Sequence, residues 1–199
     1  MNTNRIEAFS EGVFGVAFTL LILDFRPPES TAGLFSYLVT LWPQLLGYCI
    51  SFLLVGLIWA NHRAMFMHIT GADRMLVFLN TLLLADVAFL PFPTSLLAKA
   101  ISSRQGLSEA TFFYGLVLTV GGVFFNALWL YAGSKMQHAP KPTASKHLRG
   151  ISFRFVLGPI AYLLATLCSL EWPVLSIVLY VLLIVYFWLP GKSEQPLAT

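Results

Sequence analysis

The residues of this sequence that could do chemistry are polar side chains placed inside long apolar runs. The densest group lies in the first run and comprises Arg5, Glu7, Ser10, Glu11, Thr19 and Asp24. Two further runs carry smaller groups, which are Trp59, Asn61 and His62 in one and Asn80 and Asp86 in the other. Polar groups in apolar surroundings are costly, so they pair with one another or contact ions and protons.

The composition indicates that the surroundings of these residues are a lipid bilayer. Hydrophobic residues make up 57% of the 199 residues, charged residues only 11%, and the mean hydropathy is +0.76. A soluble domain carries about 25% charged residues, so the sequence predicts an integral membrane protein. A chain of 199 residues with this composition leaves only short loops between spans, so we expect no additional soluble catalytic or nucleic-acid-binding domain. It contains no metalloprotease, nucleophile-elbow or Walker motif, so we expect no enzyme activity.

Six apolar runs are long enough to be membrane-spanning helices, which need about 20 residues each. We expect them at 6–25, 38–60, 75–98, 110–131, 151–170 and 173–189. Pro91 and Pro93 interrupt the third run, because proline lacks the N–H that a helix interior requires. The predicted fold is therefore an all-α membrane protein, with one six-helix domain over residues 1–199.

The Lys and Arg residues predict the orientation of these spans. If the N-terminus is cytoplasmic, nine of the 12 fall on that side: Arg5, Arg63, Arg74, Lys135, Lys141, Lys146, Arg149, Arg154 and Lys192. The other three, Arg26, Lys99 and Arg104, fall on the opposite side. This distribution follows the positive-inside rule, so we expect both termini in the cytoplasm.

The first span has two distinct faces when it is drawn as a helix with 100° per residue. One side collects Arg5, Phe9, Gly12, Val16, Thr19, Leu20 and Leu23. Ser10 and Glu11 point elsewhere, at the membrane depth that the topology gives to His62 and, slightly deeper, to Asn80. The cytoplasmic ends of the first three spans, which carry these residues, can therefore form one buried polar network.

Simpler interpretations of the same residues stay open. Ser10 and Glu11 could cap a helix start, and Asn61 and His62 could lie solvated at the membrane interface. Asp86 could be protonated, face a neighbouring helix or subunit, or relay protons. The sequence Thr119-Val120-Gly121-Gly122 resembles the start of a potassium selectivity filter. It lies within a continuous span, however, so we expect its glycines to allow close helix packing.

Several motifs in order resemble one known family. Arg5-Ile6-Glu7-Ala8-Phe9-Ser10-Glu11 resembles the Arg-x-x-x-Phe-Ser-Asp signature of the transmembrane-protein-175 family of potassium channels. The similarity continues in Trp59-x-Asn61-His62 and in Phe89-Leu90-Pro91-Phe92-Pro93-Thr94. Prokaryotic members of this family are single six-helix chains of about this size. The resemblance covers the whole chain in architecture and the first three spans in motif.

The resemblance implies a homotetramer in the prokaryotic plasma membrane, with the four first helices lining a central pore. Family members have no filter loop, and bulky aliphatic side chains close the pore. The narrowest ring then maps to Val16, the hydroxyl layer linked to potassium preference to Thr19, and further lining to Leu20 and Leu23. The residues implied to hold the first helix in place are Arg5, Phe9, Ser10, Glu11, Trp59, Asn61, His62 and Asn80. No cofactor, tightly bound metal or nucleic acid is implied; potassium is the permeant ion, transiently near Thr19, and the partners are lipid and other copies of the chain.

Two residues depart from the family pattern. The motif acid is Glu11 rather than Asp, which changes its reach by one methylene. The gate position is Val16, which is smaller than the expected Ile or Leu. These departures concern selectivity and gating rather than the fold.

The resulting functional hypothesis is a passive cation channel with a hydrophobic gate and weak to moderate preference for potassium over sodium. One alternative is a proton-coupled secondary transporter in which Asp86, Glu11 and Asp24 alternate in protonation, with the interrupted third span as its moving element. The absence of an internal repeat in the sequence counts against this alternative. Another alternative is a non-conducting membrane scaffold.

Overall fold

The computed structural model describes residues 3–67, 69, 71–136 and 156–189. Within these ranges the chain is helical and contains no strand. The first helix, α1 (Thr3–Leu20), continues into the short 3-10 helix η1 (Leu21–Asp24). The other helices are α2 (Leu34–Thr40), α3 (Trp42–Phe66), α4 (Arg74–Phe89), α5 (Pro91–Ser103), α6 (Leu107–Met136), the helix Val156–Cys168 and α8 (Pro173–Trp188).

The helical stretches agree with the predicted membrane protein. In the described part of the chain, four are long and apolar enough to cross a membrane: Thr3–Asp24, Trp42–Phe66, Arg74–Ser103 and Leu107–Gly133. Two further apolar helices, Val156–Cys168 and Pro173–Trp188, are shorter. The start of the predicted 151–170 span, most of the polar loop before it and the residues after Leu189 lie outside the described residues.

The second membrane helix begins later along the chain than the sequence predicts. Residues 38–40 belong to α2, and the long helix α3 begins only at Trp42. Pro43 occupies the first turn of α3, where its missing N–H costs no hydrogen bond. The helix then continues to Phe66, beyond the predicted end at residue 60, because Met65 and Phe66 are buried in the core.

The third span is interrupted at the prolines, as predicted. Helix α4 ends at Phe89 and α5 begins at Pro91. Pro91 cannot donate to the carbonyl of Val87, which instead accepts the N–H of Leu90 at 3.3 Å. Leu90 keeps right-handed helical backbone angles, so α5 continues from α4 without an extended linker.

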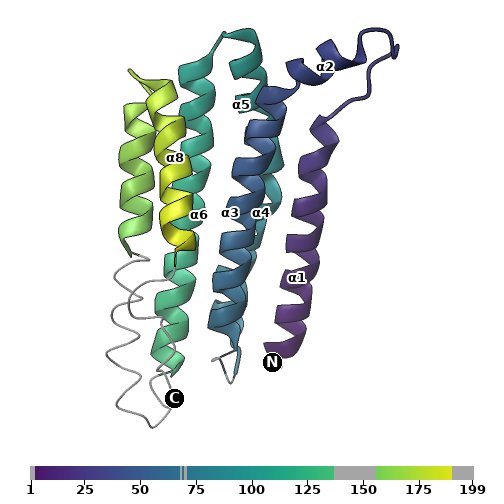
Figure 1. Cartoon of the computed structure of the whole chain (residues 1–199). Helices are drawn as coiled ribbons and strands as arrows, with labels where there is room; N and C mark the ends of the chain where they lie inside the picture. Colours follow the sequence, from purple (N-terminus) through teal and green to yellow (C-terminus); the bar gives the residue numbers. More distant parts are fainter. Residues whose placement is uncertain (1–2, 68, 70, 137–155, 190–199) are drawn as a thin grey trace, which may run out of the picture.

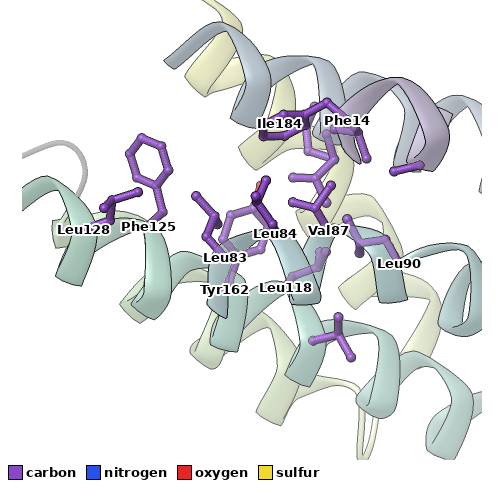
Figure 2. Close-up of a cluster of buried hydrophobic side chains, with 14 of the residues drawn as sticks. Phe14, Leu83, Leu84, Val87, Leu90, Leu118, Phe125, Leu128, Tyr162 and Ile184 are labelled. Atoms are coloured by element: carbon purple, nitrogen blue, oxygen red, sulfur yellow. The ribbon is translucent and has the colours of Figure 1, made fainter. Parts of the chain in front are cut away.

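Helix α1 lies at one edge of the bundle, where it packs against α3 and α4 (Figure 1). Its buried residues recur every three or four positions and therefore share one face: Ile6, Ser10, Phe14, Ala17 and Leu21. Phe14 joins a core to which α4, α6 and α8 also contribute (Figure 2), including Leu83, Leu84, Val87, Leu118, Phe125 and Ile184. Burial of this apolar face fixes which side of α1 points away from the bundle.

The glycines of α6 allow close helix packing, as the sequence predicts. A Cβ at Gly115 would overlap the Tyr180 hydroxyl, and one at Gly121 would overlap the Asp86 carboxylate. A Cβ at Gly122 would lie 3.1 Å from Cγ of Pro159. Thr119 also lies inside this helix and donates to the carbonyl of Gly115 at 2.8 Å. This segment is therefore helix packing surface, and the resemblance to a selectivity filter does not extend to its structure.

Candidate functional site

The predicted pore residues lie on the side of α1 and η1 that faces away from the bundle. Val16 is 56% exposed, Leu20 38% and Leu23 68%, whereas Phe14 and Ala17 on the opposite side are almost fully buried. Apart from the local backbone and chain neighbours within α1, a Cβ added at Gly12 or Gly15 would meet no atom within 4 Å. In the single chain, the described residues leave this surface of aliphatic side chains, glycines and one hydroxyl uncovered.

Thr19 adds a hydroxyl to this exposed surface. Its Oγ1 donates to the carbonyl of Val16 at 2.8 Å, one turn earlier in α1. Because a threonine hydroxyl has one proton, this bond leaves the oxygen lone pairs as acceptors only. Thr19 can therefore present an oxygen ligand to a cation from the same turn that exposes Val16.

Three polar residues from three helices form a buried network, which we call the Ser10–His62–Asn80 network. The Asn80 amide donates from Nδ2 to Oγ of Ser10 at 3.0 Å, and its Oδ1 lies 2.8 Å from Nε2 of His62. Since an amide oxygen only accepts, Nε2 of His62 must be the donor. The Ser10 hydroxyl in turn donates a hydrogen bond to the carbonyl of Ile6 at 2.8 Å. All three side chains are at most 2% exposed, so the network joins α1, α3 and α4 without solvent.

His62 is also held by aromatic contacts. Its ring stacks on Phe66, with centroids 4.3 Å apart, and meets the edge of Phe14 at 5.4 Å. The interpretation of His62 as a solvated interfacial residue is therefore wrong. The capping interpretation of Ser10 is also wrong, because α1 begins at Thr3 and Ser10 is buried well inside it.

Other residues of the expected network lie outside it in the single chain. Arg5, Phe9 and Glu11 are exposed, although Glu11 is close enough to His62 for a Coulombic interaction. These three therefore do not share the buried network that the sequence suggests.

The two residues from the end of α3 are bound within their own helix. Asn61 donates to the carbonyl of Leu57 at 2.8 Å. Trp59 is half-buried, and the guanidinium of Arg63 lies 5.9 Å from its ring centroid. Neither side chain takes part in the contacts between Ser10, His62 and Asn80.

The structure contains a second buried polar cluster that the sequence does not predict. Oγ of Ser51 lies 2.6 Å from Oγ1 of Thr94 and 2.9 Å from the hydroxyl of Tyr114, joining α3, α5 and α6. The Thr94 hydroxyl donates a hydrogen bond to the carbonyl of Leu90. Since each hydroxyl has one proton, Ser51 must donate to Thr94, and Tyr114 must donate to Ser51. The signal in the sequence is weak, because hydroxyl residues inside apolar spans commonly bond their own backbone.

The carboxylates Asp24, Asp86 and Glu11, which are candidates for proton transfer, lie in different places. Asp24 accepts a hydrogen bond from Ser95 of α5 at 2.6 Å, which ties the end of η1 to the bundle. Asp86 faces Gly121 of α6 and lines an internal cavity, while Glu11 is on the exposed part of α1. Within the described ranges, no three His, Cys, Asp or Glu residues are grouped to hold a metal ion.

Comparison with known proteins identifies similar chains over nearly the whole length. The model of the family described as "Endosomal/lysosomal potassium channel TMEM175" matches residues 5–91. The potassium channel B446_29190 of Streptomyces collinus is 34% identical, over 99% of this chain and 95% of that protein. The endosomal/lysosomal proton channel TMEM175 of Danio rerio is 32% identical over 66% of this chain, which corresponds to 27% of that longer protein.

A solved structure supports the same relationship. The crystal structure of a lysosomal potassium-selective channel TMEM175 homolog from Chamaesiphon minutus superposes with a TM-score of 0.82 and 35% identity. The superposition covers 93% of this chain and 95% of that one. With matching motifs, sequence and fold, the chain belongs to the TMEM175 family, whose named members here are channels rather than enzymes.

Proposed function

We propose that this chain is a potassium channel whose subunits surround a central pore lined by α1 and η1. The observation that carries the proposal is the uncovered face of α1, where Val16, Leu20 and Leu23 point away from the bundle. The similar proteins from Streptomyces collinus and Chamaesiphon minutus, both described as potassium channels, support it.

Contact with lipid alone does not account for the composition of this face. Lipid-facing helix surfaces favour large apolar side chains, whereas small residues gather where helices approach one another. The exposed side of α1 carries Gly12, Gly15 and Thr19 between its aliphatic residues, and the charged Arg5 and Glu11 near its start. This mixture fits a surface that meets other copies of α1 around a path for ions.

In the proposed homotetramer, four Val16 side chains form the narrowest ring, with Leu20 and Leu23 as further aliphatic rings. Such a ring closes a pore by steric contact or by expelling water. The Thr19 oxygens, whose protons are directed to the Val16 carbonyls, replace part of the hydration of a passing cation. Because an exposed hydroxyl layer coordinates less completely than a carbonyl filter, the preference for potassium over sodium is weak to moderate.

The Ser10–His62–Asn80 network has the proposed role of fixing the rotation of α1. Val16 follows Ser10 by six residues, which is about 240° around an α-helix. When Asn80 holds Ser10 against the bundle, Val16 is consequently directed away from it. Arg5, Phe9, Glu11 and Trp59 complete this support in the assembled channel, whereas Asn61 stays bonded within α3.

The proposed setting is the plasma membrane of a prokaryote. All six apolar helices cross the bilayer as one domain over residues 1–199, with both termini in the cytoplasm. Lipid and three other copies of the chain are its partners, no cofactor is required, and potassium is the permeant ion.

Ion flux into proteoliposomes tests the channel function. The purified chain is reconstituted with a potassium gradient and then with a sodium gradient, without a proton gradient. Fast passive flux that favours potassium and responds to substitution of Val16 is the expected result. Absence of flux under both gradients, with protein verified in the vesicles, would instead favour the non-conducting scaffold.

A second candidate is a proton-coupled secondary transporter that uses Asp86 and Glu11. It is favoured by the position of Asp86 inside the apolar stretch Arg74–Ser103, at the wall of a cavity. The same proteoliposomes distinguish it, because its potassium flux would require a proton gradient and would stop in the Asp86→Asn variant. Potassium flux in the absence of a proton gradient contradicts this candidate.

A further inference from the structure

A cavity lies between the helices of the single chain, at the level of Asp86. Its volume is about 80 Å³, and it lies between α3, α4, α6, the helix Val156–Cys168 and α8. The wall is mainly apolar and includes Leu54, Leu118, Phe125 and Phe187. One water needs about 10–15 Å³ of such volume, so the cavity has room for a small molecule.

Asp86 is the acidic group among the described residues of the cavity wall. Its carboxylate lies against the backbone of α6, in the space that a side chain at Gly121 would otherwise fill. No hydrogen bond or ion pair to this carboxylate is found among the described residues. An ionised carboxylate in the membrane interior is costly unless a positive group accompanies it. The site therefore favours a ligand that brings a cation.

Tyr162 lines the same cavity, and its hydroxyl is available for a hydrogen bond. This residue is 6% exposed and belongs to the buried cluster shown in Figure 2. Its hydroxyl has no hydrogen-bond partner in the described part of the chain, whereas the buried hydroxyls of Tyr114 and Tyr180 both have one. A buried polar group without a partner destabilises the fold, so a bound ligand that pairs with this hydroxyl would relieve that cost.

We propose that the cavity is a binding site for a small lipophilic ammonium compound. The ammonium group pairs with the Asp86 carboxylate and hydrogen-bonds the Tyr162 hydroxyl, and the apolar body packs against Leu118, Phe125 and Phe187. A bare metal ion fits less well, because the wall is mainly apolar and hard cations require several oxygen ligands. The cavity is partly open at the surface of the bundle, which gives such a ligand a route of entry.

Binding of benzylammonium tests this site, with benzyl alcohol as the uncharged control of similar shape. Calorimetric titration of the purified full-length chain in detergent gives both dissociation constants. Charge-assisted hydrogen bonds are worth more than neutral ones, so we expect benzylammonium to bind about tenfold more tightly than benzyl alcohol. Asp86→Asn should remove this difference and Tyr162→Phe should weaken benzylammonium severalfold.

Two control variants and one cavity-filling variant test whether the binding is specific for the cavity. Glu109→Gln changes an exposed carboxylate at the start of α6 and should leave both constants unchanged. Thr19→Val should also have no effect, which separates this site from binding in the pore. Leu118→Phe fills the cavity and should weaken both ligands.

Three binding results would overturn the proposal. It fails if benzylammonium does not bind saturably, or if benzyl alcohol binds equally well, since the cavity is then apolar only. It also fails if Asp86→Asn binds benzylammonium like the unmodified chain. Should Asp86→Asn not fold, as judged by size-exclusion chromatography, unchanged binding in both Tyr162→Phe and Leu118→Phe rejects the site.

Discussion

At the scale of single residues, Val16 and Thr19 act on the same turn of α1 but have separate roles. The Val16 carbonyl accepts the proton of Thr19, and the Val16 side chain is exposed beside it. An aliphatic side chain can only exclude water, whereas a hydroxyl oxygen can take the place of water around a cation. Substitutions at the two positions should therefore change different properties of the pore.

Replacing Thr19 by valine should lower the potassium-to-sodium permeability ratio and leave a conducting channel. Valine has nearly the shape of threonine but no oxygen to coordinate an ion, and the hydrogen bond it loses is local to α1. Reversal potentials with potassium on one side and sodium on the other measure the ratio. Thr19→Ser retains the hydroxyl and should retain the ratio; an unchanged ratio in Thr19→Val would exclude the hydroxyl from selectivity.

Replacing Val16 by asparagine should increase the resting leak of the channel. A ring of amides holds water in a constriction that a ring of aliphatic side chains dries out. The matched control is Val178→Asn on α8, because Val178 is exposed to a similar degree, 47% against 56%, on a helix outside the proposed pore. Flux into proteoliposomes measures the leak, and equal flux in the two variants would remove Val16 from the gate.

At the scale of helices, the bonds between elements distinguish two asparagines that the sequence groups together. Asn80 of α4 bonds both Ser10 of α1 and His62 of α3, whereas Asn61 bonds only its own helix at Leu57. Removing a buried partner leaves the other groups unsatisfied, which costs about 1–3 kcal/mol for each group. Loss of Asn80 leaves two such groups, on Ser10 and His62, without a partner. Loss of Asn61 removes one hydrogen bond to the carbonyl of Leu57, which also accepts a backbone hydrogen bond within α3.

We therefore expect Asn80→Ala to lower the free energy of unfolding by about 2–6 kcal/mol, and Asn61→Ala by much less. Thermal or denaturant unfolding in detergent, followed by tryptophan fluorescence, compares the two. Because the network fixes the rotation of α1, Asn80→Ala should also shift the assembled protein to smaller species on size-exclusion chromatography. Equal destabilisation by the two variants would contradict the proposed role of the network.

The sequence predicts the helices of this bundle better than the contacts between them. Hydropathy located the apolar helices because span length depends only on local composition, and the prolines located the break between α4 and α5. The sequence predicts Ser10, His62 and Asn80 close together because their predicted depths in the membrane agree. The Ser51–Thr94–Tyr114 cluster and the exclusion of Asn61 depend on how each helix is rotated about its axis. That rotation is set by packing between helices, such as the close approach at Gly121, which no single span encodes.

At the scale of the whole molecule, the bundle is asymmetric. Helix α1 is covered on one side by α3 and α4 and uncovered on the other, while α8 lies toward the opposite end of the bundle (Figure 1). A pore between copies of the chain requires the uncovered side of each α1 to face a common axis. The α8 side would then be peripheral in the assembly.

A pair of cysteine variants tests this arrangement. Cys49 and Cys168, the free cysteines of the described chain, are first replaced by alanine. Val16→Cys in this background should form an intermolecular disulfide with mild oxidant, because a closed ring brings equivalent side chains within the short Cβ separation that a disulfide needs. Val178→Cys is similarly exposed but peripheral, so it should stay monomeric on a non-reducing gel. Cross-linking by Val178→Cys and not by Val16→Cys would place α8 at the axis and require a different pore.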